Sequence, residues 1–437
     1  FNTASWPRSE IVFIPHEISA GYNFVTDDQG KPAPAQRLNT RELAVLVRDL
    51  PPFSGRRYTL LKQGERPALS KLTASGAVIE NDKLRVRLDE KTGGIAELRA
   101  TDIEANLADA AGGHAINDYL YLIGDDRAVL QRNGPVTITV RERGPLVASL
   151  LVESDAPGCH KLLREIRLMA GADYVELLDT VDKKRLEAAS YTAKDGKESV
   201  NIAFPFHVPG GEVRLDVPLG VIRPEHDQIP SACKNWLTIG RWANVSNRDY
   251  GVTLVTLDAP LLQLGGITAT LLNSQTNPDG WIKKLEPTQK LYVWAMNNHW
   301  HTNYRAYQEG PVQFRFVLRP HRGRAGDAEN SRFATAFSQP LVATTACGPA
   351  PSPTPVLRVE PSDILVTAFK PSDDGQALIV RLFAANGTPA NAKLTWSKPV
   401  PKTVWLSDTS EKPLQKLTGD IPVPGWGVVT LRAELPK

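Results

Sequence analysis

The chain has 437 residues, of which 41% are hydrophobic and 23% are charged, and these proportions suit a globular protein with a sizeable core. One core rarely grows beyond about 250–300 residues, so the length suggests about two to four domains. The formal net charge is only +3, and the sequence has no basic or acidic block. Charge therefore gives no support to a nucleic-acid or membrane-surface partner.

Neither a transmembrane segment nor a leader is visible in the sequence. No run approaches 18 apolar residues, and the chain opens at Phe1 without Met, a basic stretch or an apolar stretch. We therefore expect that upstream residues were removed or that this is a piece of a larger protein. Three scattered cysteines (Cys159, Cys233 and Cys347) are too few for a disulfide framework, and one pair plus one thiol stays open. The cysteines do not decide between a cytoplasmic and an exported protein.

Alternating apolar and polar residues dominate the chain from end to end. This period of two is typical of half-buried strands, and it recurs at residues 84–88, 136–140, 252–257, 314–318, 365–369 and 377–382. Turn residues such as Lys91 to Gly94, Asn277 to Gly280 and Asn386-Gly387 separate the strands. Residues 104–111 form the one plausible helix, and residues 41–46 suit a helix or a strand. The sequence predicts an all-β fold of sandwiches.

Two proline-rich stretches suggest domain boundaries. The first is Pro51 to Gly55, which ends a strand-rich segment. The second, Gly348 to Pro355, holds four prolines in eight residues, which favour an extended backbone and cannot donate to a sheet. We predict a small β domain at 1–66, a large β domain at 67–347, a linker at 348–355 and a C-terminal β domain at 356–437.

Metal-binding and common catalytic motifs are scarce. His299 and His301 have ligand-like spacing on a strand, but a lone H-x-H without a nearby carboxylate is weak evidence for a metal, and an aromatic, polar loop is the simpler interpretation. G-x-S-x-G, G-x-x-x-x-G-K-[ST], G-x-G-x-x-G and H-E-x-x-H are absent. Paired carboxylates are better explained as solvated loop tips than as acid–base pairs: Asp125-Asp126, Asp373-Asp374 and Glu225-His226-Asp227.

The richest polar and aromatic patch runs from Trp294 to Tyr304. Aromatic faces stack on the C–H surfaces of sugars, while amide and imidazole groups can fix sugar hydroxyls. The competing interpretation is a core strand with aromatic plugs followed by an Asn-rich turn. The residues we single out as candidates to face carbohydrate are Asn297, Asn298, His299, Trp300, His301, Asn303 and Tyr304.

Several segments of the chain together resemble one known family. These segments are Phe1 to Arg8, Ile79 to Ile95 with its K-T-G-G-I turn, Lys197 to Phe206, Tyr250 to Pro260, Asn297 to Tyr304, Gln308 to Gly310, Phe314 to Gly323 and Ile379 to Leu382. Their order and spacing across nearly the whole chain carry the resemblance more than any one of them does. The family that they resemble is glycoside hydrolase family 38, the retaining α-mannosidases.

The resemblance covers only the family's C-terminal all-β region, and it implies a large domain with a galactose-mutarotase-like supersandwich. It also implies that zinc, bound by two His and two Asp with one H-x-D pair, lies in a catalytic domain outside this sequence. None of the eight histidines here begins H-x-D. No catalytic residue carries over, we expect no cofactor in this chain, and its implied partners are the catalytic domain of the same protein and an α-mannoside or glycan.

Two functions of different classes stay open at this point. The first is a non-catalytic part of a zinc-dependent α-mannosidase that braces the catalytic domain and contributes to carbohydrate recognition. The second is a stand-alone carbohydrate-binding or mutarotase-like protein, in which a His acid and a Glu base would act. His207 and His299 are conceivable acids, but the sequence places no Glu beside them.

Overall fold

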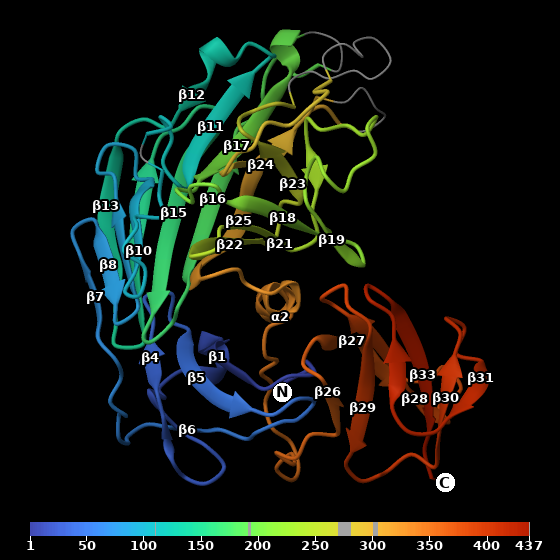
Figure 1. Ribbon diagram of the computed structural model, residues 1–437. Coiled ribbons are helices and arrows are strands. Elements are labelled where there is room, and N and C mark those ends of the chain that lie inside the picture. The colour runs from blue at the N-terminus through green and yellow to red at the C-terminus, as the bar shows by residue number, and fades with distance from the viewer. Residues whose placement is uncertain (110, 191–193, 270–280, 300–304, 437) are drawn as a thin grey trace. The chain divides into compact units, whose positions relative to one another are not determined.

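The computed structural model describes residues 1–109, 111–190, 194–269, 281–299 and 305–436 (Figure 1). The chain forms two compact units. Unit 1 comprises residues 1–68, 218–220 and 326–437, and unit 2 comprises residues 69–217 and 221–325. Strands dominate both units, which confirms the all-β prediction. The predicted boundaries after residues 66 and 347 stay predictions.

The largest sheet of unit 2 contains nine strands as far as the described residues extend. It includes the long antiparallel neighbours β15 and β16, which are residues 159–169 and 175–183 and are joined by a short turn. In spatial order the strands are β13 (Val136–Arg143), β14 (Val147–Ser154), β15 (Cys159–Met169), β16 (Val175–Lys183), β25 (Gly310–Arg322), β22 (Tyr250–Thr256), β21 (Trp242–Ser246), β18 (Glu212–Val217) and β19 (Gly220–Ile222).

A second sheet of unit 2 contributes the other side of the core. Its strands in spatial order are β12 (Gln131–Arg132), β11 (Asp118–Ile123), β17 (Glu198–Pro205), β24 (Lys290–Asn297), β23 (Leu261–Leu264) and β20 (Leu237–Thr238). Side chains alternate along β17, so Val200, Ile202 and Phe204 join one continuous core with residues of the nine-stranded sheet. Two short 3-10 helices, η1 (Arg127–Val129) and η2 (Lys194–Gly196), lie in the connecting loops.

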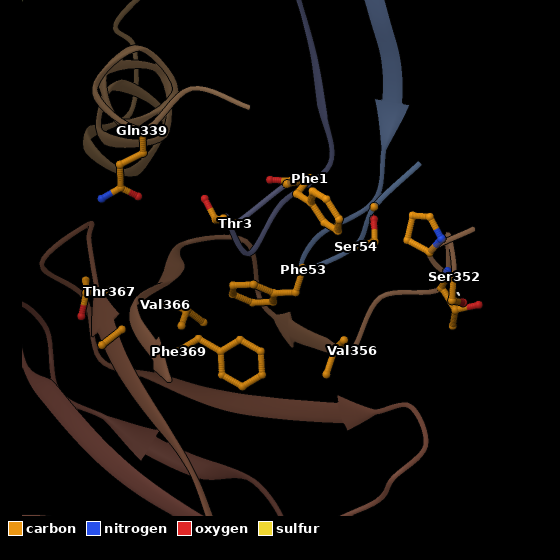
Figure 2. A pocket seen from close by; sticks show the side chains of 15 residues that line it. Phe1, Thr3, Phe53, Ser54, Gln339, Ser352, Val356, Val366, Thr367 and Phe369 are labelled. Atoms are coloured by element: carbon orange, nitrogen blue, oxygen red, sulfur yellow. Dashed lines mark hydrogen bonds between the residues drawn. The ribbon is translucent and has the colours of Figure 1, made fainter. Parts of the chain in front are cut away.

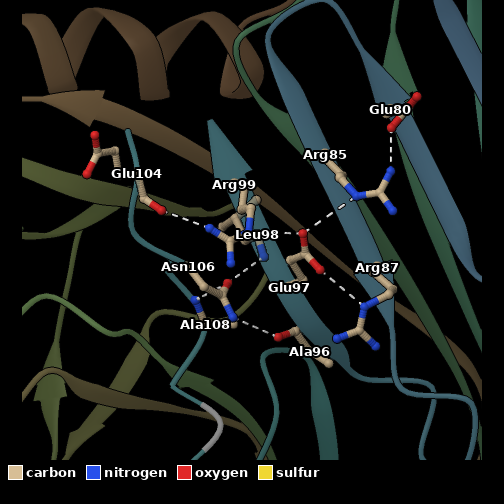
Figure 3. Close-up of polar contacts among 10 residues, drawn as sticks. All are labelled: Glu80, Arg85, Arg87, Ala96, Glu97, Leu98, Arg99, Glu104, Asn106 and Ala108. Atoms are coloured by element: carbon tan, nitrogen blue, oxygen red, sulfur yellow. Dashed lines mark hydrogen bonds and ion pairs between the residues drawn. The ribbon is translucent and has the colours of Figure 1, made fainter. Parts of the chain in front are cut away.

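A four-stranded sheet completes unit 2 and corrects one prediction. Its order is β10 (Ile95–Ala100), β9 (Leu84–Leu88), β8 (Val78–Asn81) and β7 (Leu72–Ser75). The predicted helix at 104–111 is wrong, because residues 104–109 are irregular. Asn106 explains this: its amide donates to the Ala96 carbonyl at 3.0 Å and its oxygen accepts from the Leu98 N–H at 3.0 Å, so residues 104–108 cover the edge of β10 (Figure 3).

The solvent side of the four-stranded sheet carries a charged cluster around Glu97. Its carboxylate pairs with Arg87 at 3.2 Å, with Arg99 at 3.0 Å and with Arg85 at 3.5 Å, and Arg85 also reaches Glu80 at 2.5 Å (Figure 3). The three guanidinium groups are each nearly half exposed, so water screens these pairs and each contributes at most about 1 kcal/mol. This cluster is the polar face that the alternation at residues 84–88 predicts.

The N-terminal part of unit 1 consists of two small sheets. One has the order β1 (Arg8–Ile14), β5 (Leu43–Leu50) and β4 (Ala35–Arg37), and the other β3 (Pro32–Ala33), β2 (Phe24–Thr26) and β6 (Thr59–Leu61). Residues 41–46, which suit a helix or a strand by sequence, therefore enter a strand. Val25, Leu43 and Val45 are buried between the sheets. The guanidinium of Arg37 donates to Ser19 Oγ at 2.7 Å and fastens the one-turn helix α1 (His16–Ser19).

The C-terminal part of unit 1 is a sandwich of two sheets with a helix beside it. One sheet has the order β26 (Leu357–Glu360), β29 (Ala390–Trp396) and β32 (Ile421–Val423). The other has the order β27 (Ile364–Pro371), β28 (Ala377–Ala384), β33 (Val428–Glu434), β30 (Thr403–Ser407) and β31 (Pro413–Leu417). Phe53 from the N-terminal part lies in the core of this sandwich, so the two parts of unit 1 share a core.

Helix α2 (Asp327–Ser338) was not predicted from the sequence. Asp327 and Glu329 lie in its first turn, where their negative charge interacts favourably with the partial positive charge of the helix N-terminus. Ala328 of the helix packs against Leu365 of β27 and Ala385. No helix of the described residues is both long and apolar enough to cross a membrane. All three cysteines are free thiols.

Candidate functional site

The polar and aromatic patch singled out in the sequence begins where β24 ends. Asn297 is the last residue of β24, and it pairs with Ser199 of β17 in the middle of the six-stranded sheet. Asn298 and His299 follow directly. The other candidates to face carbohydrate (Trp300, His301, Asn303 and Tyr304) lie outside the described residues, so the geometry available is that of Asn297, Asn298 and His299.

Asn298 is a buried anchor between three chain segments. Its side-chain amide donates to the carbonyls of Gly196 and Ala306, both at 2.8 Å, and its oxygen accepts from the Glu198 N–H at 2.6 Å. Only 7% of the residue is exposed. Both amide hydrogens are used by backbone carbonyls, so this side chain fixes where the chain leaves β24 and where it returns at Ala306.

Beyond Ala306, the chain is held by an aromatic contact. The guanidinium of Arg185 lies 3.9 Å from the ring centre of Tyr307, which is within the range of a cation–π interaction. Arg305 lies 5.9 Å from the same ring. Arg185 and Arg305 therefore place two positive charges near the Tyr307 ring, close in sequence to the candidate patch.

His299 has a buried, neutral imidazole. The residue is 6% exposed, and its ring meets the Trp294 ring edge-on with centroids 5.3 Å apart. Burial lowers the pKa of His299 to about 4, and the nearby Ala269 backbone offsets this only in part. Neither ring nitrogen completes a hydrogen bond of normal geometry among the described residues. At neutral pH this ring is uncharged, so it is a poor general acid.

Two buried lysines, Lys183 and Lys197, lie close to the strand ends near Asn298. Lys197 donates to the carbonyls of Asn298 and His299 at 3.3 and 3.1 Å, and burial lowers its pKa. Lys183 of β16 is 2.9 Å from both carboxylate oxygens of Glu198, whose second partner is the Tyr121 hydroxyl at 2.6 Å. We call Lys183, Glu198, Tyr121, Lys197 and Asn298 the buried polar cluster, which connects the nine-stranded sheet to the six-stranded sheet.

A second polar site in unit 2 was missed by the sequence reasoning. A cavity of about 180 Å³ is lined by His114, Asp118 and Arg132 among others. His114 Nδ1 lies 2.9 Å from the Tyr292 hydroxyl, and burial lowers the pKa of His114 to about 4. Burial raises the pKa of Asp118, whose Oδ2 accepts from the Ala115 N–H at 2.8 Å and lies 3.6 Å from Arg132.

The K-T-G-G turn lies beside this cavity, and the packing around it explains why glycine is needed at position 93. Gly93 has a φ of 72°, and a Cβ atom there would approach Arg164 to 2.7 Å and a methyl of Val152 to 2.4 Å. Arg164 is buried and donates to the Asn117 carbonyl at 2.8 Å, and Asn117 in turn donates to Asp179 at 2.9 Å. The family-like turn is therefore required by close packing around a buried guanidinium. No signal in the sequence identified Asp118 or Asp179.

The paired carboxylates considered in the sequence serve local structure. The Asp126 side chain caps η1, and Asp227 and Asp373 pair with Arg223 and Lys370 at 3.0 and 2.8 Å. Glu225 accepts from Lys234 at 2.7 Å. Within the described ranges, no three His, Cys, Asp or Glu side chains come together as a metal site.

Two models of known families match segments of this chain. The glycosyl hydrolases family 38 C-terminal domain matches residues 79–279, and the family 38 C-terminal beta sandwich domain matches residues 363–432. No curated protein sequence is significantly similar to this chain.

Solved structures agree with this fold. An alpha-mannosidase from Enterococcus faecalis V583 aligns with 99% of this chain and 55% of its own, at 14% identity and a TM-score of 0.73. A glycosyl hydrolase family 38 protein from Enterococcus faecalis aligns with 99% of this chain and 57% of its own, at 14% identity and a TM-score of 0.70. A galactose mutarotase-like protein from Lactobacillus casei aligns with 56% of this chain and 99% of its own, at 13% identity and a TM-score of 0.33.

The sequence thus spans little more than half the length of the two Enterococcus faecalis proteins. The two family models match in the order expected for a C-terminal region, one in unit 2 and the other in the C-terminal sandwich of unit 1. This chain is a C-terminal, all-β region of glycoside hydrolase family 38.

Proposed function

We propose that this chain is the non-catalytic β region of an α-mannosidase-like glycoside hydrolase, which braces a zinc-dependent catalytic domain and contributes to carbohydrate recognition. The observation that carries the proposal is the ordered match of two family 38 C-terminal domain models. The whole protein would hydrolyse α-mannosides with retention of configuration, and zinc and the nucleophile would come from the catalytic domain.

The buried polar cluster supports a positioning role for the segment from Asn297 to Tyr304. Asn298 binds the backbone at Ala306, and Lys197 binds the carbonyls of Asn298 and His299. A substrate-contacting segment needs such fixed ends, because a displacement of about 1 Å can cost about a hundredfold in rate. Of the carbohydrate-facing candidates, the buried Asn298 and His299 would then anchor the segment, and the others would contact the sugar at the rim of the cleft.

The activity test compares this chain with a longer form of the protein that includes the catalytic domain. We expect zinc-dependent hydrolysis of an aryl α-mannoside by the longer form, its loss on chelation, and no hydrolysis above background by this chain. The reason is that a retaining double displacement needs a nucleophile and an acid that we assign outside this sequence. Robust hydrolysis by this chain alone would overturn the proposal.

Trp300→Ala tests the recognition role directly. If Trp300 contacts sugar, the variant of the longer form raises KM for the mannoside, while the melting temperature of this chain barely changes. Trp405→Ala is a matched control, since Trp405 lies in β30 of the C-terminal sandwich. If Trp300 is a core residue instead, truncation costs about 3–5 kcal/mol of folding stability and the melt collapses.

The mutarotase-like alternative requires a protonated His and a Glu base on one sugar. His299 is buried with a pKa lowered to about 4, His207 is exposed, and Glu198 is held by Lys183 and Tyr121. Polarimetry of freshly dissolved α-galactose and α-glucose with this chain tests the alternative. Acceleration of mutarotation would favour it over the α-mannosidase assignment.

A further inference from the structure

Unit 1 contains a cavity of about 540 Å³ that none of the motifs above explains (Figure 2). Its walls come from residues 1–3, residues 53–55, Gln339, and residues between 351 and 369 around the start of the C-terminal sandwich. The volume falls within the range of about 300–1,000 Å³ that is usual for small-molecule sites. We call this cavity the Phe53 pocket.

Aromatic rings form one side of the Phe53 pocket. The rings of Phe53 and Phe369 lie with centroids 4.7 Å apart and are inclined by 56°. The centroid of the Trp396 ring lies 6.2 Å from that of Phe369. Phe1 is 50% exposed and lies near Phe53 in Figure 2. Gly55 leaves room for the Phe1 ring, since a Cβ atom there would approach it to 2.8 Å. The pocket thus offers apolar ring surface that water can reach.

Polar, uncharged side chains also line the pocket, and they lie on both sides of the rings. Hydroxyl and amide side chains come from Thr3, Ser54, Gln339, Ser352 and Thr367, and Figure 2 shows Thr3 and Gln339 on one side of the rings and Ser352 on the other. The side chains that line the pocket are not titratable, and the one charged group among the described lining residues is the α-amino group of Phe1, which donates to the Val342 carbonyl at 2.8 Å. A cationic ligand would find no carboxylate here, and an anionic ligand would have to compete with the Val342 carbonyl for a single ammonium, so the lining favours a neutral ligand.

An added peptide strand is a poor fit for the same place. β27 is an edge strand of its sheet and passes through the pocket wall, so its backbone could in principle pair with a peptide. The register of β27 shifts between Val366 and Ala368, however, and the Val366 N–H already donates to Ser5 Oγ at 3.2 Å. A bulge disrupts the regular ladder at an edge. Peptide recognition by strand addition is therefore disfavoured.

We propose that the Phe53 pocket binds a neutral carbohydrate. The C–H face of a pyranose would lie against Phe369 and Phe1, and its hydroxyls would pair with Thr3, Gln339 and Ser352, which can donate and accept. This site is separate from the patch at the end of β24, and it stands on the lining of the pocket alone. Binding would hold together the N-terminal part and the C-terminal sandwich of unit 1, because both contribute walls.

The test uses this chain, two neutral probes and two matched variants. Saturation-transfer NMR measures binding of α-linked mannobiose and of maltose, with glucuronic acid and a neutral tetrapeptide as competing ligand classes. Thr367→Trp fills the pocket from an exposed strand position, whereas Thr395→Trp makes the same change at an exposed position of β29 that does not line the pocket. Circular dichroism melts check that both variants fold.

We expect saturation transfer from the chain to at least one disaccharide, at least tenfold weaker binding in Thr367→Trp, and unchanged binding in Thr395→Trp. Preference for the tetrapeptide or for glucuronic acid would overturn the proposal, as would equal disaccharide binding by both variants or no binding by the parent chain. If Thr367→Trp does not fold, Gln339→Ala replaces it, and unchanged binding there counts against the proposal. These outcomes leave the mannoside hydrolysis assay untouched, so the two proposals fail independently.

Discussion

The buried polar cluster of unit 2 and the Phe53 pocket of unit 1 use polar side chains in opposite ways. In the cluster, Lys183, Glu198 and Asn298 are less than a tenth exposed and bond to other protein groups. In the pocket, Thr3 and Gln339 line an open cavity, and Ser54, Ser352 and Thr367 line it too while bonding to the backbone of Pro51, Thr354 and Arg381. Density of polar residues in a sequence therefore does not by itself mark a ligand site. What matters is whether the polar atoms are already used by the protein.

The energetic consequence of this difference is large. A buried ion pair that loses one partner leaves a charge without compensation in a medium of low dielectric constant. A polar group at the rim of an open pocket can exchange its partner for water at little cost. Variants of the cluster should therefore lower folding stability strongly, whereas variants of the pocket rim should change binding and leave folding nearly unaffected.

The largest expected effect is that of Glu198→Gln. This variant leaves the Lys183 ammonium buried without its carboxylate, and we expect a loss of about 3–5 kcal/mol in the free energy of unfolding, measured by urea denaturation. Asp373→Asn in unit 1 is the control, because its partner Lys370 is at the surface and little change is expected. The double variant Lys183→Met with Glu198→Leu should recover much of the loss. Equal effects of the two single variants would contradict the comparison.

Asn298→Ala should have the next largest effect. It removes three hydrogen bonds to buried backbone groups, each worth about 0.5–1.5 kcal/mol net, and we expect a loss of about 2–4 kcal/mol. Asn386→Ala in unit 1 is the matched change, at a half-buried loop residue that bonds Asp363 and the Thr388 N–H. We expect a smaller loss there, by chemical denaturation. A result in which Asn386→Ala is the more destabilising would contradict the role assigned to Asn298.

The pH dependence of folding stability should reflect the buried titratable groups of unit 2. Burial raises the pKa of Asp179 in unit 2 to about 7 from its ordinary value of 3.8. The folded state then holds a proton that the unfolded state has lost between about pH 4 and 7, so this group makes stability fall as the pH rises through that window. Asp179→Asn should flatten that fall in a series of thermal melts.

His114 acts in the opposite direction within the same unit. Burial lowers the pKa of His114 to about 4 from 6.5, so the unfolded state binds the extra proton first and stability falls as the pH drops from about 6.5 to 4. His114→Gln should reduce the loss on acidification. A wild-type slope between pH 4 and 7 that neither variant changes would show that other groups control the titration.

The sequence predicts the strands better than it predicts the connections between them. The alternation at residues 84–88 and 377–382 appears as β9 and β28, in which buried residues mostly alternate with exposed residues in β9 and with half-buried residues in β28. The helix at 104–111 fails because Asn106 pairs with the backbone of β10, a contact that local propensity cannot reveal. Helix α2 was missed because its apolar contacts are made with residues distant in sequence, such as Leu365.

The sites were harder to predict than the strands. The sequence shows the density of Asn and aromatic residues after Trp294. It does not show that the Asn298 amide donates to the Gly196 and Ala306 carbonyls, because only the fold brings these partners together. The Phe53 pocket left no signal, because Phe53 and Phe369 are more than three hundred residues apart in the sequence. Neutral rim residues of this kind carry no motif.

The smallest expected change in folding stability comes from cutting the proline-rich stretch. Residues 342–350 are exposed and without regular structure, and they contain the Ala, Thr and Val that elastase accepts, so elastase should cut there or at 351–355 before any strand. First cuts inside 365–382 would instead contradict the predicted linker.

We further expect the two fragments to co-elute on gel filtration, because Phe53 lies in the core of the C-terminal sandwich and its carbonyl accepts from the Val356 N–H at 3.3 Å. Phe53→Ala removes the ring from that shared core but keeps the backbone hydrogen bond, and it should weaken the association of the two fragments after cutting, whereas Val428→Ala, an exposed change on β33, should not. Fragments of the parent chain that separate at once would show that the shared core around Phe53 does not hold the two parts of unit 1 together.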